Sequence, residues 1–258
     1  MSDTPGGPRD QAESGELPAL RRRLLAGMLR HAPFDGWSAP ALAAAARDEG
    51  IAPDLAAIAF QGGPAEVAEF FQIDADRRMV EAVRAALADA ATAAEAGAAP
   101  LKLRDKVALT IRTRLIQQAP HREALRALAA FLALPAHAGQ AARGLWRTVD
   151  AMWRVIGDRS TDFNYYSKRV MLAGVYGSTV LVWLDDASEG FAGSFAFLDR
   201  RIADVMAIEG CKARWRQSWQ GLFRRAGGLR GGAPAGFSGR AARGGVAPPA
   251  NPASTPQA

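Results

Sequence analysis

The stretch GDRSTDFNYYSKRVMLAGVYGSTVLVWLDD, residues 157–186, contains a run from Val170 to Leu184 without a single charged residue. Ser178 and Thr179 are the only small polar residues in this run, which carries no histidine, carboxylate or cysteine. A helix that is apolar on all sides is typically buried on all sides. We therefore predict a helix here that is enclosed within the protein and contributes packing rather than catalysis.

One face of this predicted helix has small residues in its middle. Val170, Gly174, Gly177 and Leu181 recur at helical spacing, although each glycine costs a helix about 1 kcal/mol relative to alanine. The glycines indicate that something approaches closely, either another helix or an elongated apolar ligand in a pocket. These four residues are our candidates for lining an apolar pocket.

Composition limits the class of protein. A chain of 258 residues that is 49% hydrophobic can form one sizeable core. The single cysteine, Cys211, excludes a disulfide framework and suits a reducing compartment. The N-terminal sequence lacks the features of signal and transit peptides, and no apolar run reaches the roughly 18 residues of a membrane span. We expect a cytoplasmic protein.

Positive charge is concentrated at the C-terminal end. Of the 32 basic residues, eight lie after Gly210, where there is no acidic residue; the other 24 share the preceding 209 residues with all 26 acidic ones. A slightly acidic body with a basic tail is typical of a chain whose tail meets a polyanion, either nucleic acid or an anionic membrane.

Helical periodicity extends through most of the sequence, and runs of alternating β-branched residues are absent. We predict an all-α domain over residues 17–209, as part of a fold of about nine or ten helices, with disordered tails at 1–16 and 229–258. Proline and glycine signals predict helix breaks at Pro33, Gly50, Gly62 to Pro64, Pro100, Pro120, Pro135, Gly157 and Gly190.

The segment FDGWSAPALAAAARDEGIAPDLAAIAFQGGPAEVAEFF, residues 34–71, has the layout of a helix-turn-helix, in a helix-turn-helix-like part over about 17–75. In TetR-type repressors the second helix of such a unit enters the major groove of DNA. Here no lysine or arginine occurs between Arg47 and Arg77, while Asp54, Glu66 and Glu69 are acidic. DNA binding needs cations against phosphate. We therefore interpret the unit as packing rather than DNA recognition.

A basic amphipathic helix is predicted over residues 210–228. Its large apolar residues fall at i, i+4, i+7 and i+8, with cations on the flanks and back, which is typical of a helix lying in a membrane interface. The face could instead pack on the body of the protein, or the cations could bind nucleic acid. The residues expected to bind an anionic membrane are Lys212, Arg214, Trp215, Arg216, Trp219, Leu222, Phe223, Arg224 and Arg225.

No catalytic or metal-binding motif is evident. His31, His121 and His137 are far apart in sequence, and none has metal-ligand spacing from another histidine or a carboxylate pair. No nucleophile–base pair or glycine-rich phosphate loop appears. We expect no catalytic residue, no metal and no cofactor.

Three segments together resemble a known family: residues 149–186, VDAMWRVIGDRSTDFNYYSKRVMLAGVYGSTVLVWLDD; residues 36–51, GWSAPALAAAARDEGI; and residues 131–135, FLALP. Over about residues 20–210 the chain resembles the ubiquinone-biosynthesis lipid-binding family, the ninth of the numbered coenzyme Q proteins. The resemblance implies a TetR-like all-α fold without a DNA-binding role, and an apolar cavity for lipids that include isoprenoid quinone intermediates. It also implies docking on demethoxyubiquinone hydroxylase and membrane contact through an amphipathic C-terminal helix.

The resemblance also supplies candidate partner-binding residues. The family's docking patch corresponds to Asp150, Tyr165 and Tyr166, where the first tyrosine replaces a tryptophan common in relatives, so the contact area is expected to be smaller. We expect a non-enzymatic accessory protein that is peripheral on the inner membrane of a bacterium. A homodimer is a further possible assembly. The alternatives are a TetR-type regulator with an apolar effector pocket and, less favoured, an enzyme acting on a prenylated quinone.

Overall fold

The computed structural model describes residues 8–158 and 163–207, and within these ranges the regular structure is helical. The chain divides into two compact units, Met1–Glu209 and Gly210–Ala258. The second unit lies outside the described residues, as do residues 1–7, so the predicted amphipathic helix at 210–228 and the predicted tail at 229–258 receive no structural description.

Eight α-helices and three short 3₁₀ helices have defined bounds in the described part, and residues 192–207 form a further helical segment. The predicted all-α class is therefore confirmed. The elements are α1 (Pro8–Asp35), α2 (Ala39–Asp48), α3 (Pro53–Ala59), α4 (Gly63–Glu95), α5 (Leu103–Gln118), η1 (Ala119–His121), α6 (Arg122–Leu132), η2 (Pro135–His137), α7 (Ala138–Val155), α8 (Phe163–Asp185) and η3 (Glu189–Phe191).

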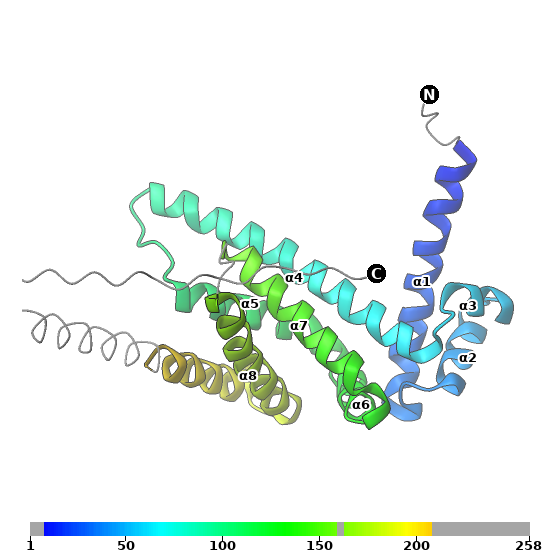
Figure 1. Ribbon diagram of the computed structural model, residues 1–258. Coiled ribbons are helices and arrows are strands. Elements are labelled where there is room, and N and C mark those ends of the chain that lie inside the picture. Colours follow the sequence, from blue (N-terminus) through cyan, green and yellow to red (C-terminus); the bar gives the residue numbers. More distant parts are fainter. Residues whose placement is uncertain (1–7, 159–162, 208–258) are drawn as a thin grey trace, which may run out of the picture. The chain divides into compact units, whose positions relative to one another are not determined.

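Helices α1 to α3 form the predicted helix-turn-helix layout at one end of α4 (Figure 1). Ser38 caps α2 by accepting a hydrogen bond from Ala41 N–H at 3.2 Å, and Gly50 supplies the positive φ of 62° that the turn before α3 requires. Trp37 Nε1 donates to the carbonyl of Ala124 in α6 at 3.0 Å. This bond ties the helix-turn-helix unit to the rest of the domain.

Two predicted boundaries in α1 are wrong. The helix begins at Pro8, not at residue 17, and it continues through Pro33 to Asp35. Proline is compatible with the first helical turn, where its missing N–H has no partner to lose. The following residues are mostly good helix formers. The helix ends where Gly36 adopts a φ of 66°, so this glycine, rather than Pro33, ends α1.

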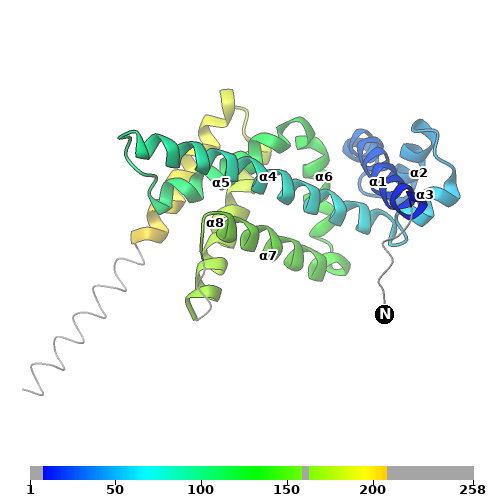
Figure 2. The same cartoon turned by 90° about the horizontal axis from the view of Figure 1, so that it is seen from above.

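Helix α4 runs from α1–α3 at one end to α5 at the other (Figure 2). It contributes residues to two hydrophobic clusters. Its first part contributes Val67, Ala68 and Phe71 to a cluster with α1, α2, α3 and α6. Its middle contributes Met79 and Val83 to a second cluster with α5, α7, α8 and residues 192–207. A single long helix thereby couples the helix-turn-helix unit to the half of the domain that contains the candidate site.

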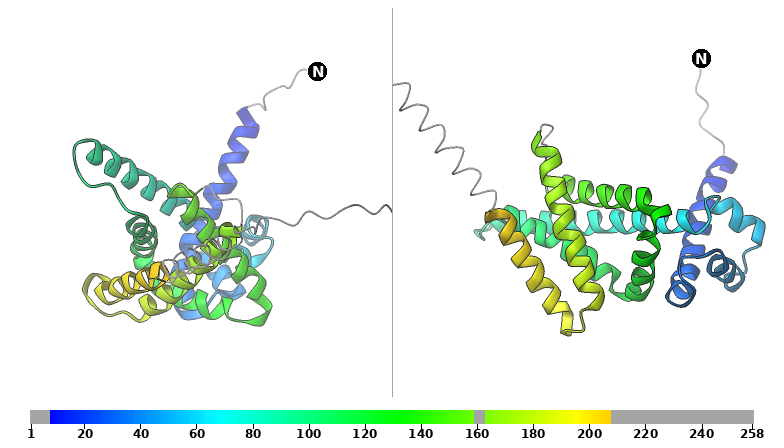
Figure 3. Two further views of the ribbon diagram at one scale, coloured as in Figure 1. Left: turned by 60° about the vertical axis from the view of Figure 1, so that its left-hand side comes forward. Right: turned by 60° about the horizontal axis from the view of Figure 1, so that its bottom comes forward.

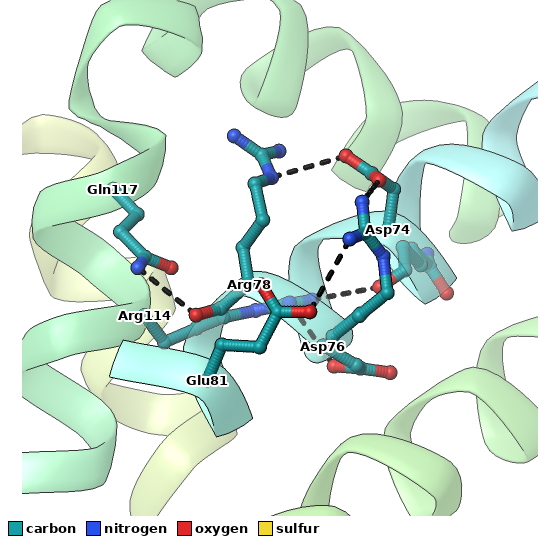
Figure 4. A network of polar contacts seen from close by, with 8 residues as sticks. Asp74, Asp76, Arg78, Glu81, Arg114 and Gln117 are labelled. Atoms are coloured by element: carbon teal, nitrogen blue, oxygen red, sulfur yellow. Dashed lines mark hydrogen bonds and ion pairs between the residues drawn. The ribbon is translucent and has the colours of Figure 1, made fainter. Parts of the chain in front are cut away.

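A buried carboxylate fixes the centre of this arrangement (Figure 4). Asp76 of α4 is 6% exposed, and Arg114 of α5 is 2% exposed. The Oδ1 atom of Asp76 lies 3.0 Å from Nη1 of Arg114. Thr148 of α7 donates to the same oxygen at 2.8 Å, and Arg147 Nε lies 3.3 Å from Oδ2. One carboxylate therefore joins three helices.

Residues 192–207 turn back from the end of α8 (Figure 3). Asp186 fixes this turn, since its carboxylate accepts hydrogen bonds from the hydroxyl and the N–H of both Ser188 and Ser194, at 2.5 to 2.8 Å. These hydrogen bonds hold the pKa of Asp186 well below its usual range, and the bond from the Ser188 hydroxyl has the largest effect. The turn places residues 192–207 next to the candidate cavity.

Replacing Asp76→Ala should destabilise the protein by about 3–5 kcal/mol, because it leaves Arg114 buried without its carboxylate. At about 2–4 °C per kcal/mol, Tm should fall by roughly 10 °C. The matched control is Asp89→Ala, an exposed aspartate on the same helix, which should change Tm by little. Thermal melting followed by circular dichroism measures both, and equal Tm values for the two variants would contradict a structural role for Asp76.

Candidate functional site

A cavity of about 220 Å³ lies among α5, α7, α8 and residues 192–207. Its walls are almost wholly apolar, and two cationic side chains, Arg104 and Lys168, complete the lining. Such a lining excludes charged ligands from the interior and favours hydrocarbon. The apolar residues are Leu103, Val107, Trp153, Met171, Leu172, Val175, Ile202, Val205 and Met206.

A wider groove of about 850 Å³ adjoins the cavity. Arg104, Ile202 and Met206 line both spaces, and the groove continues along α5 between α4 and residues 192–207. Pockets for small molecules usually measure about 300–1,000 Å³, so the cavity by itself is small. Cavity and groove together suit an elongated ligand with one end buried and the other near solvent.

Lys168 sits at the edge of the cavity in a fixed position. Its Nζ lies 2.7 Å from Asp158 Oδ1 and 5.6 Å from the ring centroid of Trp153. Trp153 Nε1 in turn donates to the carbonyl of Lys168 at 3.1 Å. The ammonium group is thus balanced by a carboxylate and an aromatic face, and the cavity interior stays apolar.

A second buried ion cluster joins α7 to α8. Arg169 is 2% exposed, and its Nε and Nη2 lie 2.8 and 2.7 Å from Asp150 Oδ1. Arg154 Nε lies 2.7 Å from the other oxygen of Asp150, and Asp158 Oδ2 is 3.6 Å from Arg169 Nη1. Asp150, a predicted partner-binding residue, therefore has both oxygens in ion pairs within the chain and positions α8.

The two predicted partner-binding tyrosines lie in the first turn of α8. Tyr166 is 62% exposed, and its ring centroid lies 6.0 Å from that of Trp146, which is 36% exposed. The side chain of Tyr165 lies outside the described part of the structure. An exposed tyrosine beside a half-exposed tryptophan has the composition of a protein-binding surface.

The predicted burial of α8 on every side is wrong. Val170 and Leu181 are 62% and 64% exposed, and a Cβ added at Gly174 or Gly177 would meet no atom within 4 Å. None of these four residues lines the cavity. They form, with Tyr166, a row along one side of α8 that we name the outer face. The contact that we expected at the glycines is absent from the described part of the chain.

The buried side of α8 is the opposite one. Leu172, Val175, Thr179 and Trp183 are 6% exposed or less, and the first two line the cavity. These residues also recur at helical spacing, so periodicity alone offered two apolar faces. Trp183, the largest side chain in the run, was the available signal for the inner face, because large aromatics dominate buried cores.

The described residues show the surface of α3 and the distribution of potential metal ligands. Helix α3, which corresponds to the recognition helix of a helix-turn-helix, exposes Leu55 and Ile58 and contains no lysine or arginine. Within the described ranges, no three histidine, cysteine or acidic residues are grouped to hold a metal ion. No described helix is long and apolar enough to cross a membrane.

A family model and several curated relatives that match this chain are all named COQ9. The COQ9 family model matches residues 138–209, which include α7 and α8. The ubiquinone biosynthesis protein COQ9-B of Xenopus laevis is 32% identical over 212 residues, covering 80% of this chain and 69% of that protein. The COQ9 proteins of Bos taurus and Homo sapiens, named mitochondrial like the frog protein, are 32% and 31% identical over 206 residues.

The chain spans a little under two thirds of the bovine and human proteins, 62% and 63% of their lengths. Among solved structures, a TetR transcriptional regulator from Nitrosomonas europaea aligns with a TM-score of 0.55 and 20% identity, over 72% of this chain and 97% of that one. At this identity the likeness shows the fold alone, and it confirms the predicted TetR-like architecture.

Alanine substitutions test whether the outer face is open. Gly174→Ala and Gly177→Ala should each stabilise the protein by up to about 1 kcal/mol, because an added Cβ meets open space there. Gly27→Ala should destabilise it, because its Cβ would lie 2.9 Å from Ala45 Cβ and 3.1 Å from the Ala45 backbone. Urea unfolding measures all three variants. A loss of stability at the α8 glycines would show that another element packs there.

Proposed function

This chain belongs to the COQ9 family, and we propose that it is a non-enzymatic, lipid-binding accessory protein of ubiquinone biosynthesis. Two thirds of the frog relative's length aligns with it at 32% identity. The observation that carries the lipid-binding part of the proposal is the cavity of about 220 Å³, in which nine of eleven lining residues are apolar. An apolar lining of this kind favours binding of a hydrocarbon group.

The proposed ligand is an isoprenoid quinone intermediate. Its prenyl chain would lie in the cavity against Leu172 and Val175 of α8, and its ring would lie toward the groove, near Met206. Arg104, at the junction of cavity and groove, offers hydrogen-bond donors where a polar ring would sit. The protein would then hold a water-insoluble substrate with its reactive ring near the surface, which is what an accessory protein of a membrane pathway needs.

The proposed partner is demethoxyubiquinone hydroxylase, docked on the outer face of α8. Tyr166, Val170 and Leu181 are each more than 60% exposed there, and a contiguous apolar face of this kind marks a contact surface. The buried Arg169 and its carboxylates would hold α8 rigid for docking. Asp150 would contribute through Arg169, and Tyr165 and Tyr166 would contact the partner directly.

Attachment to a membrane is proposed from sequence. The basic amphipathic segment at residues 211–225 lies outside the described residues, and its aromatic and cationic pattern suits the surface of an anionic membrane. We propose a peripheral location on the inner membrane of a bacterium, where isoprenoid quinones reside. The hydroxylase and the lipid would then share one surface with this protein.

Filling the cavity should displace the lipid. Val175→Trp adds an indole ring at a position that is 6% exposed and lines the cavity, so co-purifying isoprenoid quinone should fall several-fold while the helical spectrum is retained. The control Val170→Trp makes the same replacement on the exposed side of α8 and should retain the lipid. Mass spectrometry of extracted lipids, scaled to protein, is the measurement. Equal retention by both variants would refute binding in this cavity.

Truncating the exposed tyrosine should weaken docking without unfolding the protein. Tyr166→Ala should reduce the affinity for the hydroxylase by about 1–3 kcal/mol, the range of a hot-spot aromatic, with Tm nearly unchanged because the side chain is 62% exposed. The contrasting variant Asp150→Ala should lower Tm, because it removes the nearer of the two carboxylates that pair with the buried Arg169. Calorimetry with purified hydroxylase measures the affinity. Unaltered binding by Tyr166→Ala would place the partner elsewhere.

A further inference from the structure

The connection between α4 and α5 has an unusual surface. Residues 95–104 are all exposed, and among them Leu101 and Leu103 are 37% and 46% exposed. Lys102 stands between the two leucines, and Arg104 follows them. Single exposed leucines need no explanation, but leucines alternating with cations at one protruding turn form a defined amphipathic pattern. Figure 1 shows this turn at the end of α4 far from α1–α3.

The exposure of these leucines is built into an ordered turn. Helix α4 ends at Glu95 and is followed by Gly97, whose φ is 101°, and Ala98 N–H closes the helix by donating to the Ala93 carbonyl at 2.9 Å. Helix α5 is capped in turn, because Asp105 Oδ2 accepts from Lys102 N–H at 3.2 Å. Both helix ends carry capping hydrogen bonds, and Leu101 and Leu103 beside them are exposed.

The charge of this surface is positive. Residues 95–106 contain three cations, Lys102, Arg104 and Lys106, and two carboxylates, Glu95 and Asp105, so the cations are in excess by one. Asp105 lies 3.4 Å from Arg104 Nε and also caps α5. Asp199, on the other side of the groove, is paired with Arg112 at 2.7 Å. The turn thus offers cations to an anionic surface, and Asp105 and Asp199 are already held in ion pairs or a helix cap.

The same turn forms the mouth of the candidate site. Leu101 lines the groove, Leu103 lines the cavity and Arg104 lines both. Met206, which is 46% exposed, also lines both and adds apolar surface beside the leucines. The exposed apolar residues are therefore continuous with the apolar interior.

We propose that the α4–α5 turn is a membrane-contact surface for an anionic bilayer, with Leu101 and Leu103 entering the interface and Lys102 and Arg104 binding lipid headgroups. Interfacial protein segments combine apolar and cationic residues in this way. The inference rests on the proposed lipid binding and deepens it. A cavity mouth held against the bilayer lets a prenyl chain enter without crossing water, which would be costly for hydrocarbon.

A probe on the turn tests insertion directly in the full-length chain. The background carries Cys211→Ser, so that a cysteine introduced by Ala99→Cys can be labelled with an environment-sensitive fluorophore. Ala57→Cys is the matched control, an exposed alanine on α3. Vesicles of phosphatidylcholine, with or without phosphatidylglycerol, carry nitroxide-labelled acyl chains that quench only an inserted probe.

On vesicles containing phosphatidylglycerol, the probe at residue 99 should shift to the blue and be quenched, and the probe at residue 57 should remain as in buffer. High salt should reverse the effect, since headgroup attraction is screened. Three results would each overturn the proposal: no association with anionic vesicles, association without quenching at residue 99, or equal quenching at both positions.

Substitutions in the turn provide a second measurement. The pair Leu101→Ser and Leu103→Ser should lower quenching at residue 99 several-fold. The control pair Leu55→Ser and Ile58→Ser removes two apolar residues of α3 that are more exposed than Leu101 and Leu103 and should leave quenching unchanged. Lipid extraction from the same preparations separates the two hypotheses. Quenching without co-purifying quinone would support the membrane-contact surface and refute the proposed quinone ligand. Co-purifying quinone without quenching would support the ligand and refute the membrane-contact surface.

Discussion

The carboxylate of Asp76 is the constraint on which the rest of the domain depends. A buried charge is tolerated only if it is paired and hydrogen-bonded, and Asp76 meets this condition by binding Arg114 of α5 together with Arg147 and Thr148 of α7. Any relative shift of α4, α5 or α7 would leave a charge unpaired. The three helices therefore form one rigid frame, against which α8 and residues 192–207 pack and enclose the cavity.

The frame explains how the helix-turn-helix layout is held in place without lysine or arginine on α3. Helices α1 to α3 are joined to α4 through Phe71 and its neighbours, and to α6 through the hydrogen bond from Trp37. These contacts need apolar and aromatic side chains but no cations. Packing contacts are therefore enough to hold the TetR-like architecture. The exposed residues Leu55 and Ile58 of α3 are apolar and cannot bind phosphate.

Helix α8 serves two surfaces at once. Its inner side, with Leu172 and Val175, lines the cavity, and its outer side exposes Tyr166, Val170 and Leu181. The buried Arg169, paired with Asp150 of α7 and with Asp158, prevents rotation of the helix between these two environments. A partner on the outer face would therefore contact the same helix that contacts the lipid, and the α4–α5 turn would present the other end of the cavity to the membrane.

The sequence by itself determined the helical class, most helix boundaries and the family, because apolar periodicity, the turn glycines and the motif around residues 157–186 are local properties. It also predicted the helix that forms α8, of which Leu172 and Val175 line the cavity. Which side of α8 is buried was decided only by tertiary structure, since Val170 to Leu184 is apolar all round and a 3.6-residue period cannot choose between two apolar faces. The choice follows from long-range contacts: Arg169 must face Asp150, and Trp183 must reach Phe191 across the turn after α8. The residues that line the cavity could not be predicted from the sequence either. They come from α5, α7, α8 and residues 192–207, segments that only the folded chain brings together.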